Sequence, residues 1–288
     1  METVVSVLIV VKNEENYISS CLSSLLAQTF KNFEIVIVDD LSSDATKEKI
    51  FAFDDERIHY FVNKKFIGRS GSRNKSLELA KGKYLFFTDG DCCVNKNWIE
   101  EGMKYLKNPN VIGVEGKTIY VSEEYKPTRS DFVVENSRGG QFMTCNIAYK
   151  RDALEKIGGF DERLTHLEDR DIALRAIKQS QIIFNDKMIV HHQKKTMSPR
   201  QFLKTADILG NRVLLYKKFG DSTLFLWRIA MPIDLAELIF PPIIFGSFLV
   251  NKYKSKKDFD LFPYIYVKLL LERLRFWKIC AKERVFLL

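Results

Sequence analysis

The N-terminal part of the chain alternates between β-branched apolar runs and helical patterns, and this alternation most constrains the fold. Val4 to Val11 is a nearly continuous apolar run, typical of a strand buried on both faces of a parallel sheet. Apolar residues at helical spacing then predict a helix from Glu14 to Gln28, capped by Asn13. Phe33 to Val38 predicts the second strand, so the sequence indicates a βαβ unit.

The predicted strands end in acidic residues. Asp39-Asp40 follows the second strand, and a strand from Tyr84 to Thr88 leads into Asp89 and Asp91. Ligands of such sheets bind beyond the carboxyl ends of the strands, so we expect these carboxylates on one edge. If the strand continues through Gly90, Asp89 and Asp91 point to the same side and suit Mg²⁺ or Mn²⁺ bound to substrate phosphates. The alternative is an ordinary Asp-Gly turn.

A third strand, Ile58 to Val62, is followed by a helix that begins at Gly68 to Gly71. Arg69 and Arg73 lie near its start, where the helix N-terminus and guanidinium groups suit phosphate; the alternative is a solvated basic turn. The sequence lacks a Gly-x-Gly-x-x-Gly after the first strand and a Gly-Lys-Ser/Thr loop. A Rossmann dehydrogenase and a P-loop NTPase are therefore both disfavoured.

Further polar clusters follow in the second half of this region. Tyr120 to Gly140 is predicted to be a mobile loop over the site, followed by a strand from Phe142 to Tyr149. Glu168 and Asp169 lie at the start of a predicted helix, where the dipole favours negative charge; capping alone is the alternative. Ile182 to Phe184 and Met188 to Val190 are predicted as short strands, and the second ends in His191 and His192.

The composition limits the partners. The net charge of +8 and pI near 9.1 suit an anionic partner such as a nucleotide or a membrane surface. Nucleic acid is disfavoured because the α/β region has no interleaved basic and aromatic patch. The five cysteines show no metal-type pairing, which predicts reduced thiols in a cytosolic setting.

Taken in order, several motifs resemble the signature of family 2 glycosyltransferases with the GT-A fold. They are Val7 to Glu14, Val38 to Asp44, Ser72-Arg73-Asn74, Thr88 to Asp91, Gly158 to Glu162, and Glu168-Asp169. The resemblance covers about residues 4–195 and implies a Rossmann-like mixed sheet flanked by helices, a nucleotide-sugar donor and transfer with inversion. One departure is Val11-Lys12, where many members have a proline; it concerns the rim of the nucleotide pocket.

The resemblance also implies roles for individual residues. Asp40 resembles the residue that binds the base, usually uracil, with Asp39 beside it. Asp89 and Asp91 resemble the metal pair, with Asp91 as the direct ligand of Mn²⁺ or Mg²⁺. Asp169 resembles the general base of the Glu168-Asp169 motif. The other implied donor-binding residues are Val10, Asn13, Glu14, Arg69, Arg73 and Gly90, and His191 or His192 resembles a late histidine on metal or diphosphate.

The C-terminal region, residues 196–288, is predicted to be helical and to associate with a membrane. Ser198 to Phe219 has an amphipathic pattern, and the apolar runs Leu238 to Val250 and Leu261 to Leu271 are each shorter than a full span. Interfacial helices are favoured over a hairpin through the bilayer, because the loop from Asn251 to Lys257 is basic. The remaining alternative is a helical subdomain packed on residues 1–195 or on a second protomer.

The sequence therefore predicts an inverting, metal-dependent glycosyltransferase at the cytoplasmic face of the cell membrane. Its donor is expected to be UDP-linked and its acceptor a lipid-linked or polysaccharide glycan, with a homo-oligomer possible. Two alternatives are open: a nucleotide-sugar-binding protein without turnover, and a transferase acting on a polyprenyl phosphate, whose anionic oxygen needs no base.

Overall fold

The computed structural model describes residues 3–122, 124–125, 131, 133–193, 197–220 and 256–284. The chain divides into two compact units, which are described separately. The first comprises residues 1–125, 134–163 and 168–193, and the second comprises 126–133, 164–167 and 194–288. The predicted limits of a catalytic domain at 1–195 and a C-terminal region at 196–288 stay a prediction.

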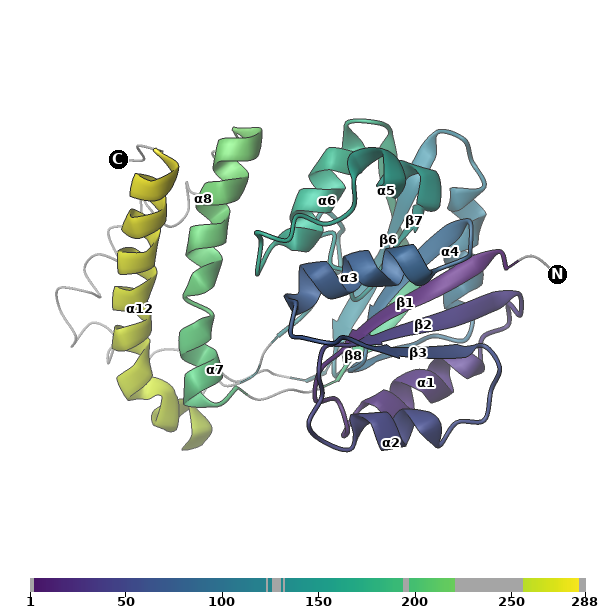
Figure 1. Cartoon of the computed structure of the whole chain (residues 1–288), viewed down its shortest axis with the longest axis horizontal. Helices are drawn as coiled ribbons and strands as arrows, with labels where there is room; N and C mark the ends of the chain where they lie inside the picture. The colour runs from purple at the N-terminus through teal and green to yellow at the C-terminus, as the bar shows by residue number, and fades with distance from the viewer. Residues whose placement is uncertain are drawn as a thin grey trace. The chain divides into compact units, whose positions relative to one another are not determined.

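The first unit is built on an eight-stranded mixed sheet in the order β3-β2-β1-β4-β7-β6-β8-β5 (Figure 1). Its first half is parallel and follows the predicted βα alternation. The elements of this half are β1 (Val5–Val11), α1 (Ile18–Leu26), β2 (Phe33–Asp39), α2 (Thr46–Phe51), β3 (Ile58–Val62), α3 (Gly68–Leu79) and β4 (Tyr84–Asp89).

The second half of the sheet mixes directions. Strand β7 is antiparallel to both β4 and β6, β8 is parallel to β6, and β5 is antiparallel to β8. The elements here are β5 (Cys92–Val94), α4 (Trp98–Leu106), β6 (Val111–Tyr120), β7 (Ile147–Lys150), α5 (Arg151–Ile157), α6 (Glu168–Ile177) and β8 (Gln181–His192). The predicted mixed α/β sheet is confirmed.

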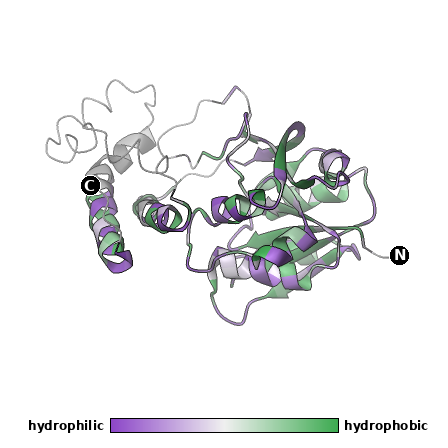
Figure 2. Ribbon diagram, turned by 90° about the horizontal axis from the view of Figure 1, so that it is seen from above, coloured by the Kyte–Doolittle hydropathy of each residue, from purple (hydrophilic) through white to green (hydrophobic). Residues whose placement is uncertain are grey.

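The apolar residues of the strands supply a core on each face of the sheet. Val5, Val7 and Ile9 of β1 pack with residues of α1 and α4 on one face, while Leu8 belongs to the other face with residues of α5 and α6. Burial on both faces explains the continuous apolar run of β1, because side chains alternate across a strand. Figure 2 shows hydrophobic residues concentrated on the strands.

Three local predictions about this unit are wrong. Helix α1 begins at Ile18 and not at Glu14, because Asn13 has a left-handed backbone (φ 58°) and its side chain accepts from the Ser43 amide. The strand predicted from Phe142 begins only at Ile147. The two short strands predicted before the histidines are one strand, β8, with a register irregularity against β6 between Gly116 and Lys117.

The second unit contains α7 (Pro199–Lys204), α8 (Asp207–Phe219) and α12 (Lys256–Glu283). A capping box between Ser198 and Gln201 starts α7. The single helix predicted from Ser198 to Phe219 is divided, because the Ala206 amide bonds to the Leu203 carbonyl, three residues back, and the Thr205 hydroxyl bonds to Phe202. Helix α8 packs on α12 through a small apolar cluster that includes Val213, Leu215 and Phe276.

The predicted apolar run Leu238 to Val250 and the basic loop Asn251 to Lys257 lie mostly or wholly outside the described residues, whereas Leu261 to Leu271 lies within α12. Among the helices that the structure describes, none combines the length and the hydrophobicity needed to cross a membrane.

Candidate active site

The parallel half of the sheet aligns the ends of three strands. In register, Val11 of β1 faces Asp39 of β2, and Val10 of β1 faces Asp89 of β4. Asp39, Asp40 and Asp89 therefore lie on the same edge of the sheet, as expected from the carboxyl ends of parallel strands. This edge is the candidate active site.

Asp39 and Asp40 are buried, and hydrogen bonds surround both carboxylates. Asp39 accepts from the Ser42 amide at 2.7 Å and from the Tyr60 hydroxyl at 2.8 Å. Asp40 accepts from the amides of Ile67 and Gly68 at 3.0 and 2.9 Å. The amide at the N-terminus of α3 thus binds a carboxylate of the protein, where the sequence analysis expected a phosphate.

Arg69 and Arg73, expected near that phosphate, differ in environment. Arg69 is exposed to solvent, whereas Arg73, one turn later on α3, is buried. The two arginines therefore do not form one guanidinium cluster at the helix start.

The loop after β1 is bound to the loop after β2. The amides of Asn13 and Glu14 donate to the hydroxyls of Ser42 and Thr46 at 2.9 and 2.7 Å. Lys12, in the Val11-Lys12 pair that departs from the resemblance, donates to the Asp40 carbonyl at 3.1 Å and lies 4.0 Å from the centre of the Phe66 ring. These bonds fix the loop that carries the predicted donor-binding residues Asn13 and Glu14, next to Val10.

Gly90 forms a turn, so Asp89 and Asp91 do not continue one strand. A Cβ added at Gly90 would lie 3.0 Å from a methyl group of Val11 and 3.2 Å from Glu14, so only glycine fits without displacing its neighbours. The condition for convergence through strand alternation, a strand that continues through Gly90, is therefore not met, and Gly90 and Asp91 lie in a turn.

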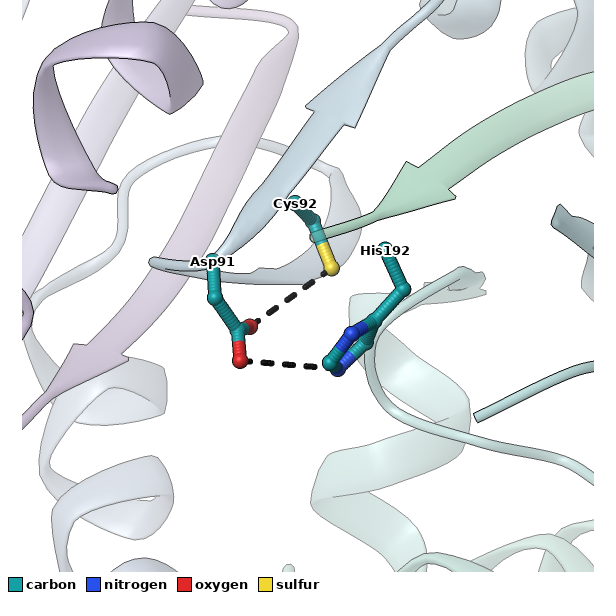
Figure 3. A group of neighbouring side chains, drawn as sticks. All are labelled: Asp91, Cys92 and His192. Carbon is teal, nitrogen blue, oxygen red and sulfur yellow. Dashed lines mark hydrogen bonds and ion pairs between the residues drawn. The ribbon is translucent and has the colours of Figure 1, made fainter. Parts of the chain in front are cut away.

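Asp91 meets Cys92 and His192 instead (Figure 3). An Asp91 carboxylate oxygen lies 3.5 Å from His192 Nε2, and the other lies 3.8 Å from Cys92 Sγ. Among the described residues, these three form the group with ligand atoms within 4.8 Å of one another, and Asp89 and His191 lie outside it. His192 follows His191 on β8, so their side chains leave on opposite faces.

The donor set of this group fits a divalent cation. His192 Nδ1 lies 2.9 Å from the Gln193 carbonyl, which only accepts, so Nδ1 carries a proton and Nε2, on the side of Asp91, is the nitrogen that could bind a metal. Carboxylate oxygens suit Mn²⁺ and Mg²⁺ and imidazole suits several transition metals, so the pair fits a divalent cation without selecting one. Burial raises the pKa of Cys92, so its thiol stays protonated and adds little as a ligand.

Arg73 joins two parts of the site. Its guanidinium donates to Glu168 at 2.5 Å and lies 3.5 Å from Asp89; the side chains of Arg73 and Glu168 are only 7% and 5% exposed. Burial lowers the pKa of Arg73, but the nearby carboxylates outweigh it and the net direction is upward, so Arg73 stays charged. The ion pair fixes the start of α6 to the edge of the sheet where β4 ends.

Asp169 follows Glu168 on α6 and has an unusual acidity. Burial, reinforced by the neighbouring charge of Glu168, raises the pKa of Asp169 from 3.8 to about 7. One oxygen accepts from the Arg170 amide at 2.8 Å. A carboxyl group whose pKa lies near neutrality is suited to exchange protons at physiological pH.

Two buried residues with specific partners escaped the sequence analysis, one in the group around Asp91 and one in β6. Cys92 was not assigned to the site because its neighbourhood to His192 depends on the pairing of β5 with β8. Glu115 is buried in β6 and accepts from the amides of Gly140, Gln141 and Phe142. It anchors the C-terminal end of the loop predicted at Tyr120 to Gly140, and its only sequence signal was a charged residue within an apolar strand.

Comparison with known proteins identifies the class. Residues 6–158, more than half of the chain, match glycosyl transferase family 2. The chain belongs to this family, and the predicted glycosyltransferase assignment is confirmed.

Several curated relatives carry named activities. WfgD and WfaP of Escherichia coli, each a "UDP-Glc:alpha-D-GlcNAc-diphosphoundecaprenol beta-1,3-glucosyltransferase", are 35% and 31% identical over 187 and 179 residues. These matches cover 62% and 59% of this chain and 71% and 68% of the relatives. Glycosyltransferase AglE of Haloferax volcanii is 28% identical over 56% of this chain, which spans only 57% of AglE.

Solved structures share the fold. Mannosyltransferase PcManGT from Pyrobaculum calidifontis, in complex with GDP-Man and Mn²⁺, has a TM-score of 0.64 at 14% identity, covering 96% of this chain and 88% of that chain. S. aureus TarS 1–349, in complex with UDP-GlcNAc, has a TM-score of 0.58 at 18% identity, covering 98% and 91%. The predicted GT-A architecture is confirmed.

Proposed function

We propose that this protein is an inverting glycosyltransferase that transfers a sugar from a UDP-linked donor to a hydroxyl group of a lipid-linked glycan. The observation that carries the proposal is the position of Asp169. It has a pKa near 7 and follows Glu168, whose ion pair with Arg73 ties α6 to the strand end that carries Asp89. A proton acceptor thus lies near the carboxyl ends of the strands, which is where α/β folds bind their ligands.

The reaction divides between the residues of this edge. Asp169 takes the proton of the acceptor hydroxyl, while the oxygen attacks the sugar from the face opposite the leaving nucleotide, which inverts the anomeric centre. Arg73 is a positioning residue: it holds Glu168, and through it the start of α6, so that Asp169 keeps its place.

Asp91 and His192 are the residues that would hold a divalent cation, Mn²⁺ or Mg²⁺. A bound cation supplies charge stabilisation to the departing diphosphate. Asp89 and His191, which lie outside the group around Asp91, have weaker support as ligands. We propose that these two side chains contact the diphosphate.

The nucleotide is proposed to lie against the loops after β1 and β2. Asp39 and Asp40 hold these loops in shape. Each carboxylate oxygen can accept more than one hydrogen bond, so either residue can also accept a hydrogen bond from the nucleotide base. Asn13, Glu14 and Val10 border the same place. WfgD and WfaP are named as UDP-glucose enzymes and a TarS structure holds UDP-GlcNAc, which supports uridine over guanosine.

The acceptor class is proposed from the same two relatives, whose names specify a diphosphoundecaprenol-linked sugar. A hydroxyl acceptor on such a lipid needs a base, whereas a polyprenyl phosphate does not. The presence of a carboxyl with a pKa near 7 therefore favours the hydroxyl acceptor.

The test is transfer by the purified full chain. A panel of UDP- and GDP-sugars is first screened for thermal stabilisation of the protein in Mn²⁺, and stabilising donors are then offered with a diphospholipid-linked GlcNAc acceptor. We expect a UDP-sugar to be transferred, with product of inverted anomeric configuration by NMR. Donor binding without transfer to any lipid-linked or glycan acceptor would instead identify a nucleotide-sugar-binding protein.

A further inference from the structure

Helix α12 has one face fixed within the second unit. Phe276 and Cys280 are buried in the apolar cluster with Val213 and Leu215 of α8. Ion pairs support the same orientation: Arg275 bonds to Asp207 at 2.5 Å, and Lys217 bonds to Glu283 at 2.8 Å. The rotation of α12 about its axis is therefore set by contacts on this face.

The opposite face of α12 exposes large apolar side chains. Val267, Leu270, Leu274 and Trp277 are 41%, 42%, 59% and 57% exposed. Their spacing of three, four and three residues places them on one side of the helix over a length of about 15 Å. We call these four residues the α12 stripe. Single exposed apolar residues are ordinary, but a contiguous row of four marks an interaction surface.

The charges around the stripe have one sign. By helical spacing, Arg273 and Lys278 lie along its two borders, and Lys278 is exposed. The acidic residues between Val267 and Arg284 are Glu272 and Glu283, and both lie away from the stripe in ion pairs with Lys268 and Lys217. The surface offered to a partner is thus an apolar row, ending in a tryptophan, between basic borders.

We infer that the α12 stripe docks on the interfacial region of an anionic lipid bilayer. Apolar side chains of such a helix enter the boundary between headgroups and acyl chains, basic borders attract anionic headgroups, and tryptophan favours this depth. A second copy fits less well, because two stripes packed face to face would bring basic borders together without acidic partners. The inference rests on the proposed function in one respect: a lipid-linked acceptor lies at such a surface.

The direct test is co-sedimentation of the full chain with vesicles of phosphatidylcholine, with and without phosphatidylglycerol. We expect binding to the anionic vesicles, weaker binding to neutral ones, and partial release by salt. Changing Leu270→Asp together with Leu274→Asp should weaken vesicle binding by about tenfold or more, because it places two anions in the apolar row. Binding that is unchanged in this double variant would overturn the inference.

A matched control distinguishes an effect of charges placed in the stripe from an effect of the added charge alone. Tyr105→Asp with Ile177→Asp changes two exposed apolar residues of the first unit and adds the same charge. This control should bind vesicles as the wild type does, and an equal loss would contradict the inference. Trp277 gives a second readout: its emission, obtained by subtracting the Trp277→Phe spectrum, should shift to shorter wavelength with anionic vesicles, and an unchanged spectrum would also contradict it.

Two further outcomes are distinguishable. If the wild type is a dimer that the double variant dissociates, and neither binds vesicles, the stripe contacts a second copy and the inference fails. Transfer to an acceptor with a short, water-soluble lipid should be unchanged in the double variant. If neither protein transfers sugar while vesicle binding behaves as predicted, the proposed function fails and the docking surface stands.

Discussion

Two groups of carboxylates lie along the same edge of the sheet, and they are held in opposite ways. Asp39, Asp40 and Asp44 accept hydrogen bonds from backbone amides of the neighbouring loops. At Asp44, partial burial raises the pKa, but the bonds from Thr46 and Glu15 outweigh it and the net direction is downward. Asp169 receives one amide bond, and burial raises its pKa to about 7.

The difference distinguishes carboxylates that hold the backbone from a carboxyl group that can exchange a proton. A carboxylate surrounded by donors remains an anion and fixes the backbone around it. A carboxyl group with few donors, beside another acid, can change its protonation state near neutral pH. We therefore propose that the carboxylates after β2 hold the backbone in shape and that Asp169 of α6 serves proton transfer.

The largest expected effect is on the reaction itself. Asp169→Asn should lower the rate of transfer to a hydroxyl acceptor by about a hundredfold to ten-thousandfold, because an amide cannot take the proton. The dissociation constant of the donor, measured by calorimetry, should be unchanged. Asp186→Asn, an exposed charge change on β8, is the matched control. Full activity of Asp169→Asn would show that both carboxylate groups are scaffold.

The next effect is on stability. Arg73→Met should lower the free energy of unfolding by about 3–5 kcal/mol, because it leaves Glu168 buried without a counter-charge. Adding Glu168→Leu should recover much of this loss without recovering transfer. Lys75→Met removes the exposed pair with Glu78 and should cost about 1 kcal/mol or less in urea titrations. Equal losses of unfolding free energy in Arg73→Met and Lys75→Met would contradict the buried role of Arg73.

The two adjacent histidines give a matched pair for the metal. Donor binding in Mn²⁺ should weaken about tenfold or more in His192→Ala, as in Asp91→Ala, because both belong to the candidate cation site. In His191→Ala, the donor should still bind more tightly in Mn²⁺ than in EDTA, as is expected of the wild type. A reversed result, with His191 responsible for the metal effect, would move the site away from Asp91.

The smallest expected effect concerns a carboxylate that holds a loop. Asp40→Ala should cost about 1–3 kcal/mol of stability, because the amides of Ile67 and Gly68 lose their acceptor. Asp54→Ala, an exposed change on the same half of the sheet, should remain within about 0.5 kcal/mol. Thermal melts of both variants check this, and similar melting temperatures would mean that Asp40 does not hold the loop.

Much of the fold and the location of the site could be predicted from local patterns. The buried run of β1 and the acidic ends of β2 and β4 identified the parallel half and its functional edge, because register in a βαβ unit follows from hydrophobic pattern. The order of the motifs identified the family. The long-range pairing of β5 with β8 could not be predicted, since the three residues of β5 do not specify a partner.

The partners of individual side chains were also beyond local patterns. Position 90 has little room for a Cβ because Val11 and Glu14 lie close to it, and this contact crosses more than seventy positions of sequence. The ion pair of Arg73 with Glu168 spans a still longer separation. Such contacts decide that Asp91 meets His192 and that Arg73 supports α6, and they depend on packing of the whole sheet.

The pH dependence of kcat/KM for transfer to a hydroxyl acceptor tests the central claim most directly. In the proposed reaction the carboxylate form of Asp169 takes the proton, and this form is lost as the pH falls through its pKa of about 7. We predict that kcat/KM of the wild type falls about tenfold for each unit of pH below this value. The residual kcat/KM of Asp169→Asn should not show this fall at low pH. The same fall in both proteins would contradict the assignment of Asp169 as the base.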